Sequence, residues 1–186
     1  SNALGVSANN AAASGTMVRQ RATLELEKPS GGSDVTVLLE ALTLTGVGFG
    51  TMLANGNHAR FADTLGVLRN VSGNNSWAGT VTFDTGAPTA VYLPELRGGW
   101  GMGWINKGLP FINVVADKLT VTGDFGGQDE MAKFGPGTLE LAGVIARGTD
   151  RNNHIFEGTV LLNNVPGVQV QRGRWYVGSD VAGAPA

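Results

Sequence analysis

Cysteine is absent from the sequence, which excludes structural disulfides and cysteine-ligated metal sites. Charge is scarce: charged residues are 15% of the 186, against about a quarter in an average soluble domain. The net charge is −2 and Lys and Arg form no run, so we expect no nucleic-acid partner. No apolar run approaches the roughly 18 residues of a membrane helix, so we expect no membrane-embedded segment.

Glycine, by contrast, is abundant, with 29 residues, about twice its usual share of roughly 7%. Short apolar runs separated by Gly and Asn favour an all-β architecture with many corners. In the run TLEL at 138–141, alternation places Leu139 and Leu141 on one face and Thr138 and Glu140 on the other. We therefore predict that Leu, Val and Ile fill an interior, while Thr, Glu and Gln face solvent.

Several short words recur along the chain. TLEL at 23–26 returns at 138–141, LTLTG at 42–46 matches LTVTG at 119–123, and WAGTV at 77–81 matches FEGTV at 156–160. Intervals near 20 residues are typical of a β-solenoid, whose stacked coils bury one another's apolar faces. We predict about eight coils in a rod roughly 40 Å long, because stacked strands lie about 4.8 Å apart. The matched words also predict that Trp77 and Phe156 form part of an internal aromatic stack.

A family resemblance rests on these words and their neighbours. NVSGNNSWAGTV (70–81), KFGPGTLELAG (133–143), NNHIFEGTVLLNN (152–164) and GVQV (167–170) resemble autotransporter-associated β-strand repeats. Such repeats occur in bacterial autotransporter passengers and in large surface proteins of related design. The resemblance implies a right-handed parallel β-helix that is exported and lies at the cell surface or is released. It implies no activity, because the repeats are a scaffold.

The predicted fold is therefore all-β, a single-stranded right-handed parallel β-helix over residues 4–186 with an irregular insertion around 84–113. Residues 1–3 (SNA) look like the scar of a cleaved expression tag. The N-terminus lacks the basic and apolar regions of a signal peptide. We expect one domain, which is a fragment of a larger repeat protein.

The insertion holds the first candidate site. Trp100 and Trp104, together with Tyr92 and Phe111, lie in this Gly-rich stretch. Exposed aromatic rings can stack on sugar rings, which predicts a carbohydrate or host-ligand site. Alternatively, the rings fold back and cover the flank of the solenoid.

The run GDFGGQDE holds a second candidate site, with Asp124, Asp129 and Glu130. Carboxylates on a Gly-rich loop suit Ca²⁺, although the spacing is not that of an EF-hand. The alternative is a solvated loop. The two histidines, His58 and His154, lie in predicted polar loops, and no nucleophilic triad is indicated. We expect no cofactor.

Two Asn-x-Ser sequences, at 70–72 and 74–76, have the pattern of glycosylation acceptors. The alternative is that their asparagines hydrogen-bond along a ladder of turns.

Three functions stay open. The first is a non-catalytic scaffold in a secreted or cell-surface bacterial protein, whose partners are neighbouring repeats of the same chain. The second is an adhesin that binds a carbohydrate or host ligand through the 84–113 insertion. The third is a β-helix enzyme that acts on polysaccharide, but no spacing ties basic and acidic residues together, so we expect no enzyme.

Overall fold

The computed structural model describes residues 15–19, 21–46, 48–49, 53–55, 58–60, 65–84, 110–127, 131–147, 153–163 and 175–177. All regular structure in these ranges is β-strand, which confirms the all-β prediction. Within them, no helix has the length and apolarity needed to cross a membrane.

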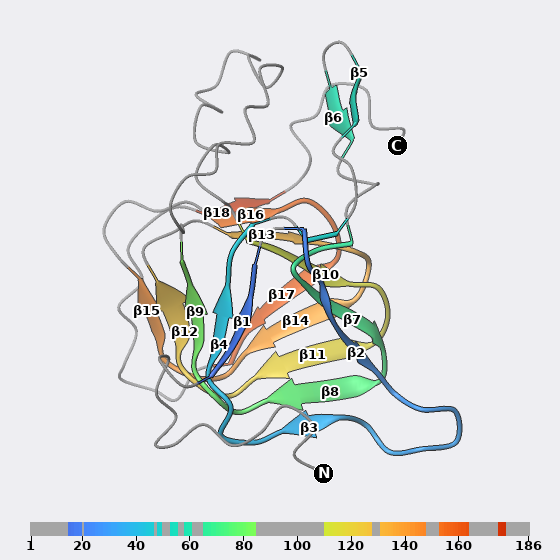
Figure 1. The fold of residues 1–186 in the computed structure, drawn as a ribbon, viewed down its shortest axis with the longest axis vertical. Helices are drawn as coiled ribbons and strands as arrows, with labels where there is room; N and C mark the ends of the chain where they lie inside the picture. The colour runs from blue at the N-terminus through green and yellow to red at the C-terminus, as the bar shows by residue number, and fades with distance from the viewer. Residues whose placement is uncertain are drawn as a thin grey trace.

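Three parallel sheets contain all but two of the described strands (Figure 1). Sheet A has the order β1 (Thr16–Val18), β4 (Leu42–Leu44), β9 (Val81–Phe83), β12 (Phe125–Gly127) and β15 (Ile145–Arg147). Sheet B has the order β18 (Trp175–Val177), β16 (Asn153–Ile155), β13 (Met131–Phe134), β10 (Phe111–Val114), β7 (Leu68–Ser72) and β2 (Leu24–Glu27). Sheet C has the order β17 (Thr159–Leu162), β14 (Thr138–Leu141), β11 (Lys118–Val121), β8 (Asn74–Trp77) and β3 (Thr36–Val37).

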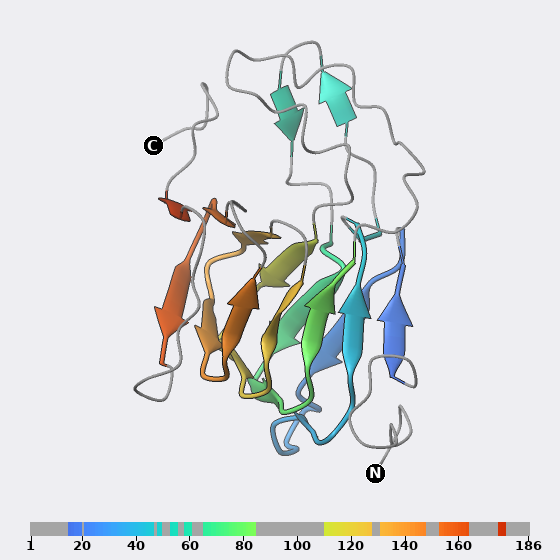
Figure 2. The ribbon, with the colours of Figure 1, turned by 90° about the vertical axis from the view of Figure 1, so that its left-hand side faces the viewer.

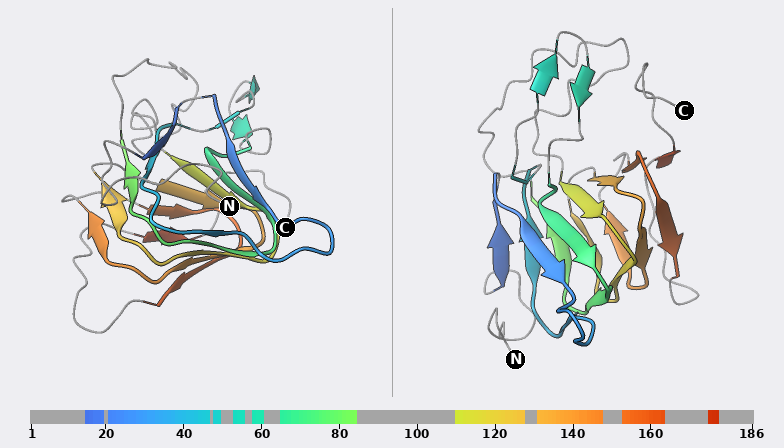
Figure 3. Two further views of the ribbon diagram at one scale, coloured as in Figure 1. Left: turned by 60° about the horizontal axis from the view of Figure 1, so that its bottom comes forward. Right: turned by 90° about the vertical axis from the view of Figure 1, so that its right-hand side faces the viewer.

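From β2 to β17, successive strands of these sheets enter B, C and A in rotation, and each such pass is called a layer. Layer 1 is β2–β4, layer 2 is β7–β9, layer 3 is β10–β12, layer 4 is β13–β15, and layer 5 is β16–β17. The register is regular: Lys118 pairs with Asn74 on one side and Thr138 on the other, and Thr138 pairs with Thr159. Figures 1 and 3 show the three sheets facing a common interior.

All three predicted repeat matches are wrong. WAGTV at 77–81 begins in sheet C and ends in sheet A, whereas FEGTV at 156–160 follows a strand of sheet B and ends in sheet C. TLEL at 23–26 lies in sheet B, but the same word at 138–141 lies in sheet C. LTLTG at 42–46 begins in sheet A, whereas LTVTG at 119–123 begins in sheet C. A short alternating word suits any strand with one buried face, so identical letters do not identify the sheet.

The predicted count of about eight coils is also too high for the part that is described, since the longest sheet has six strands.

The interior of the stack is apolar. Leu139 and Leu141 are fully buried in it, as predicted, but Glu140, which was predicted to face solvent, is buried too. Phe83 and Phe125 meet edge to face across adjacent strands of sheet A, with ring centroids 4.9 Å apart. Trp77 belongs to this core as well.

A second, smaller apolar cluster contains the buried residues Phe111, Ala132 and Phe134, with Phe156 packed against it. Trp77 and Phe156 therefore lie in different clusters, so the predicted aromatic stack between them is wrong. Phe111 is also misassigned, because it starts strand β10 and is fully buried. The irregular segment thus ends before Phe111, and residues 85–109 lie outside the described ranges.

Glycine makes the tight corners between sheets C and A possible. Gly79, Gly123 and Gly143 stand in the middle of three-residue connections in successive layers. A Cβ on Gly123 would lie 2.6 Å from the carbonyl oxygen of Ala78 and closer still to that of Gly79. A Cβ on Gly143 would meet the Gly123 carbonyl in the same way. Only glycine lets the layers approach to the distance that the strand ladders require.

Two of the connections from sheet A to sheet B, from β4 to β7 and from β9 to β10, are long, whereas the one from β12 to β13 has three residues. Between β4 and β7 the chain forms an antiparallel hairpin, β5 (Leu53–Asn55) and β6 (His58–Arg60), which stands apart from the stack (Figure 2). A parallel bridge between Gly48 and Gly66 closes the base of this excursion. Thr23 holds that base, because its hydroxyl donates to the Gly66 carbonyl at 2.7 Å and accepts from the Phe49 N–H at 2.9 Å.

Candidate functional site

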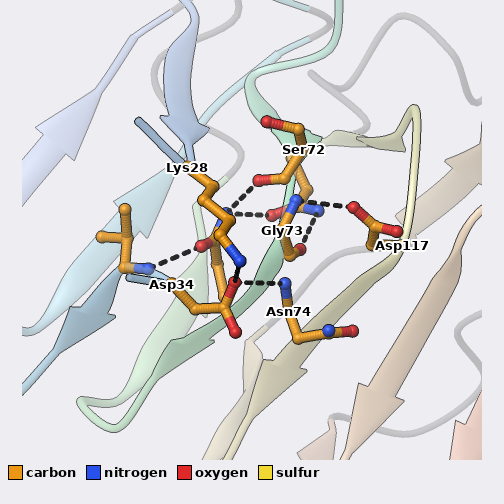
Figure 4. A network of polar contacts seen from close by, with 9 residues as sticks. Lys28, Asp34, Ser72, Gly73, Asn74 and Asp117 are labelled. Carbon is orange, nitrogen blue, oxygen red and sulfur yellow. Dashed lines mark hydrogen bonds and ion pairs between the residues drawn. The ribbon is translucent and has the colours of Figure 1, made fainter. Parts of the chain in front are cut away.

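Polar side chains gather at the corner where the chain passes from sheet B to sheet C. In layer 2 this corner is the single residue Gly73, whose φ of 91° favours glycine. The Gly73 N–H donates to Asp117 at 2.7 Å and the Asn74 N–H donates to Asp34 at 3.2 Å (Figure 4). Asp34 also pairs with Lys28 at 3.3 Å. Carboxylates from the layers on either side thus satisfy the backbone donors of the tight turn.

Two fully buried asparagines support the same turn from inside. The Asn70 amide donates to the carbonyls of Gly73 (3.1 Å) and Ala116 (2.9 Å). The Asn75 amide donates to Asn70 Oδ1 at 2.7 Å, and Asn75 Oδ1 accepts from the Val35 N–H at 2.7 Å. These bonds join layers 1, 2 and 3, as the ladder alternative for the turn asparagines predicts.

The equivalent corner of layer 4 holds a buried lysine. By register Lys133 takes the position of Ile112, yet it is fully buried. Its Nζ donates to three carbonyls: Gly135, Gly137 at 2.6 Å and, in the next layer, Glu157 at 2.9 Å. The Glu157 carboxylate in turn accepts from the Gly135 N–H at 3.2 Å. Burial lowers the pKa of Lys133 from 10.5 to about 8, against the opposing charge of Glu157.

A third polar group lies on the outer face of sheet C, around Glu140. Lys118 donates to Glu140 Oε2 at 2.7 Å, Asn163 donates to Oε1 at 2.8 Å, and the Thr120 hydroxyl donates to Oε2 at 3.1 Å. The hydrogen bonds from Lys118 and Asn163 hold the pKa of Glu140 below its ordinary value. The nearly buried carboxylate of Glu140 therefore joins its own layer to the two adjacent layers by hydrogen bonds.

Together these groups favour cohesion over chemistry. The side chains of Asp34, Asp117, Glu140 and Glu157 each accept a hydrogen bond from a neighbouring layer. A general base needs an acceptor within reach of a substrate proton, whereas these carboxylates are engaged in bonds that hold the stack together. Across the described ranges, no group of three or more His, Cys, Asp or Glu could hold a metal ion.

Most residues of the two candidate sites predicted from the sequence lie outside the described ranges. Trp100, Trp104 and Tyr92 of the aromatic site lie outside the described residues, as do Asp129 and Glu130 of the acidic site. Asp124 is exposed at the corner before β12, where its carbonyl accepts from the Val81 N–H at 2.8 Å. Both the sugar-stacking site and the Ca²⁺ site therefore stay predictions.

The predicted loop positions of both histidines are wrong. His154 lies in β16, where its ring stacks on Phe156 with centroids 5.9 Å apart. His58 lies in β6 of the hairpin. The asparagines beside His154 suggested a turn, but pairing with β13 takes this segment into sheet B.

The polar corner itself was missed by sequence reasoning. Period-two alternation through MAKF at 131–134 does place Lys133 on the same face as Met131, so one signal for a buried lysine was present. The pairing of Asp34 and Asp117 with the Gly73 turn had no such signal, because the three residues are distant in the chain.

Comparison of the chain with protein-family models, with curated proteins and with solved structures finds no match.

Proposed function

We propose that this chain is part of a right-handed parallel β-helix in an exported bacterial protein, where it acts as a non-catalytic scaffold. In this role it holds other modules away from the cell surface, and its partners are neighbouring repeats of the same chain. The rotation of strands through sheets B, C and A, with even register between layers, supports the β-helix.

One observation carries the scaffold proposal: burial of the interior depends on the neighbouring layer. By register Trp77, Val121, Leu141 and Leu162 form one row across sheet C. The first three are fully buried, whereas Leu162, in the last described strand of the sheet, is 41% exposed. A layer that buries its core only against its neighbours is the unit of a quasi-one-dimensional stack, which suits an extended spacer.

The hydrogen bonds between carboxylates and adjacent layers also support the scaffold proposal. The described carboxylates at the B–C corner and on sheet C bind backbone or side-chain donors of adjacent layers. Such bonds tie each layer to the next. Their arrangement favours mechanical continuity along the stack.

Removal of one layer tests the β-helix. Because Lys118 pairs with Thr138, deletion of residues 118–137 joins Asp117 to Thr138 and excises one 20-residue period. We expect a cooperatively folded β protein that is shorter by one strand spacing, about 4.8 Å. A matched control deletes residues 123–142, which are also 20 in number. This deletion cuts the chain at a different corner, because Gly123 and Gly143 occupy equivalent positions in successive layers. The shortened protein should fold equally well.

A deletion of ten residues, 118–127, removes half a layer and should abolish cooperative unfolding. If the half-layer and whole-layer deletions are equally folded, or both unfold, the stack is not periodic and the proposal is wrong. Circular dichroism and urea titration separate these outcomes.

The scaffold role has its own test. The chain, placed between an outer-membrane anchor and an epitope, should present the epitope to antibody and to added protease on intact cells. Release of reducing or unsaturated sugars from polysaccharides would contradict the non-catalytic role. Glycan binding that disappears in a Trp100→Ala/Trp104→Ala variant would instead establish the adhesin alternative.

A further inference from the structure

The two Asn-x-Ser sequences lie in opposite environments. Asn70 is fully buried, and its amide donates to two backbone carbonyls. Asn74 is exposed. An inaccessible asparagine and an accessible one thus lie four positions apart in the chain, each in the same sequence pattern.

Strand geometry explains the difference. In a strand, residues i and i+2 share a face. In β8 the intervening Asn75 points inward and is fully buried, so Asn74 and Ser76 project together from the outer face of sheet C. In β7 the asparagine of the pattern, Asn70, is itself the residue that points inward. The acceptor amide and the serine hydroxyl of the pattern are therefore presented together only at 74–76.

The turn fixes the backbone of Asn74 and leaves its side chain available. Its N–H donates to Asp34 at 3.2 Å, and this carboxylate is held by Lys28. The Asn74 amide group points away from that network (Figure 4). By register its neighbour in the next layer is Lys118, so this exposed position lies beside a polar side chain.

We propose that Asn74 is a modification site, the acceptor of an N-linked sugar, and that Asn70 is not. The donor is a sugar activated by a phosphate or diphosphate leaving group at C1. In the reaction the Asn74 side-chain nitrogen forms a bond to C1, the bond from C1 to the phosphate oxygen breaks, and one amide proton is released. No oxidant or reductant is needed. The inference goes beyond the scaffold function, and it needs only that the outer face of sheet C is reached by the transferring enzyme.

The folded, purified chain tests the site directly. It is incubated with a nucleotide-sugar-dependent N-glycosyltransferase and the donor, and intact mass and peptide mapping locate any added sugar. We expect one sugar per chain, on Asn74, in the wild type and in Ser72→Ala, and none in Asn74→Gln or Ser76→Ala. The two serine variants are matched, because each removes one hydroxyl of one Asn-x-Ser pattern and keeps every backbone bond.

A second arm uses a lipid-linked donor, by secretion of the chain from a eukaryotic host that glycosylates nascent chains. Folded, secreted protein should again carry sugar on Asn74 and not on Asn70, since a glycan on Asn70 would displace buried bonds. Sugar on Asn70 of folded protein, or no sugar on Asn74 in both arms, would overturn the proposal. Circular dichroism of the same samples shows whether the stack is folded, so failure of the fold is distinguishable from failure of the site.

Discussion

Replacement of Gly123 by alanine tests whether the layers are as closely stacked at the C–A corner as the fold requires. The new Cβ would lie 2.6 Å from the Ala78 carbonyl oxygen, and real Cβ atoms essentially never approach an atom within 3.0 Å. Relief requires the corner to open by about 1 Å, because repulsion is steep at these distances. The change is resisted by two bonds beside it, Thr122 N–H to the Trp77 carbonyl at 2.9 Å and Val81 N–H to the Asp124 carbonyl at 2.8 Å.

The expected loss follows from these contacts. Overpacking costs about 1–3 kcal/mol, and each of the two strained hydrogen bonds contributes about 1 kcal/mol. The sum is about 3–5 kcal/mol, a large part of the 5–15 kcal/mol typical of a domain. For a chain of this size each kcal/mol lowers Tm by about 2–4 °C, so Gly123→Ala should melt about 6–20 °C below the wild type.

Thermal melting followed by far-ultraviolet circular dichroism measures this shift. The control is Gly32→Ala in the exposed loop before β3, where the nearest atom to the new Cβ is Pro29 Cβ at 3.0 Å, on a surface that can yield. The control should change stability by less than about 1 kcal/mol. If Gly123→Ala melts with the control, the layers do not meet at this glycine and the stacking geometry is wrong.

Two further predictions concern the buried charges. The pKa of Lys133 is about 8 in the folded state and 10.5 when unperturbed, so between these values the unfolded chain holds the extra proton. The free energy of unfolding, measured by urea titration, should therefore rise with pH across this range. The variant Lys133→Met should abolish the rise. An equal rise in the variant would disprove the assignment of this pH dependence to Lys133. The pKa of Glu140 is lowered in the folded state, so its contribution is present above the ordinary value of 4.5 and is lost as pH falls through the folded pKa. Glu140→Gln should be less stable than the wild type by about 1 kcal/mol at neutral pH. It should also lose less stability on acidification. Parallel curves of the free energy of unfolding against pH for variant and wild type would contradict this.

Local patterns predicted the elements well. Alternation through residues 138–141 correctly predicted a strand with Leu139 and Leu141 inward, and the Gly-rich corners correctly predicted short connections. These features depend on residues within a few positions of one another, and a strand with one buried face needs only period two. The boundary of the irregular insertion was less accurate, because Phe111 reads equally well as an exposed aromatic or as a core residue.

Pairing between distant segments was not predictable in the same way. Whether a word such as TLEL belongs to sheet B or sheet C depends on which strands flank it after folding, and the two copies differ in this respect. Glu140 illustrates the result: its residue type and alternation predict solvent exposure, but Lys118 and Asn163 from adjacent layers enclose it. Glu140 is buried, although its position is on the outer face of the sheet, because side chains from adjacent layers cover it.

The amino-acid sequence by itself determined that this protein is all-β, that its strands are short, and that glycine occupies the corners, because alternation and backbone freedom act locally. The tertiary structure alone decided which strands stack, which carboxylates clasp the Gly73 turn, and which of two Asn-x-Ser sequences faces solvent. These outcomes depend on parallel register between layers, where a shift of one residue exchanges the inner and outer faces.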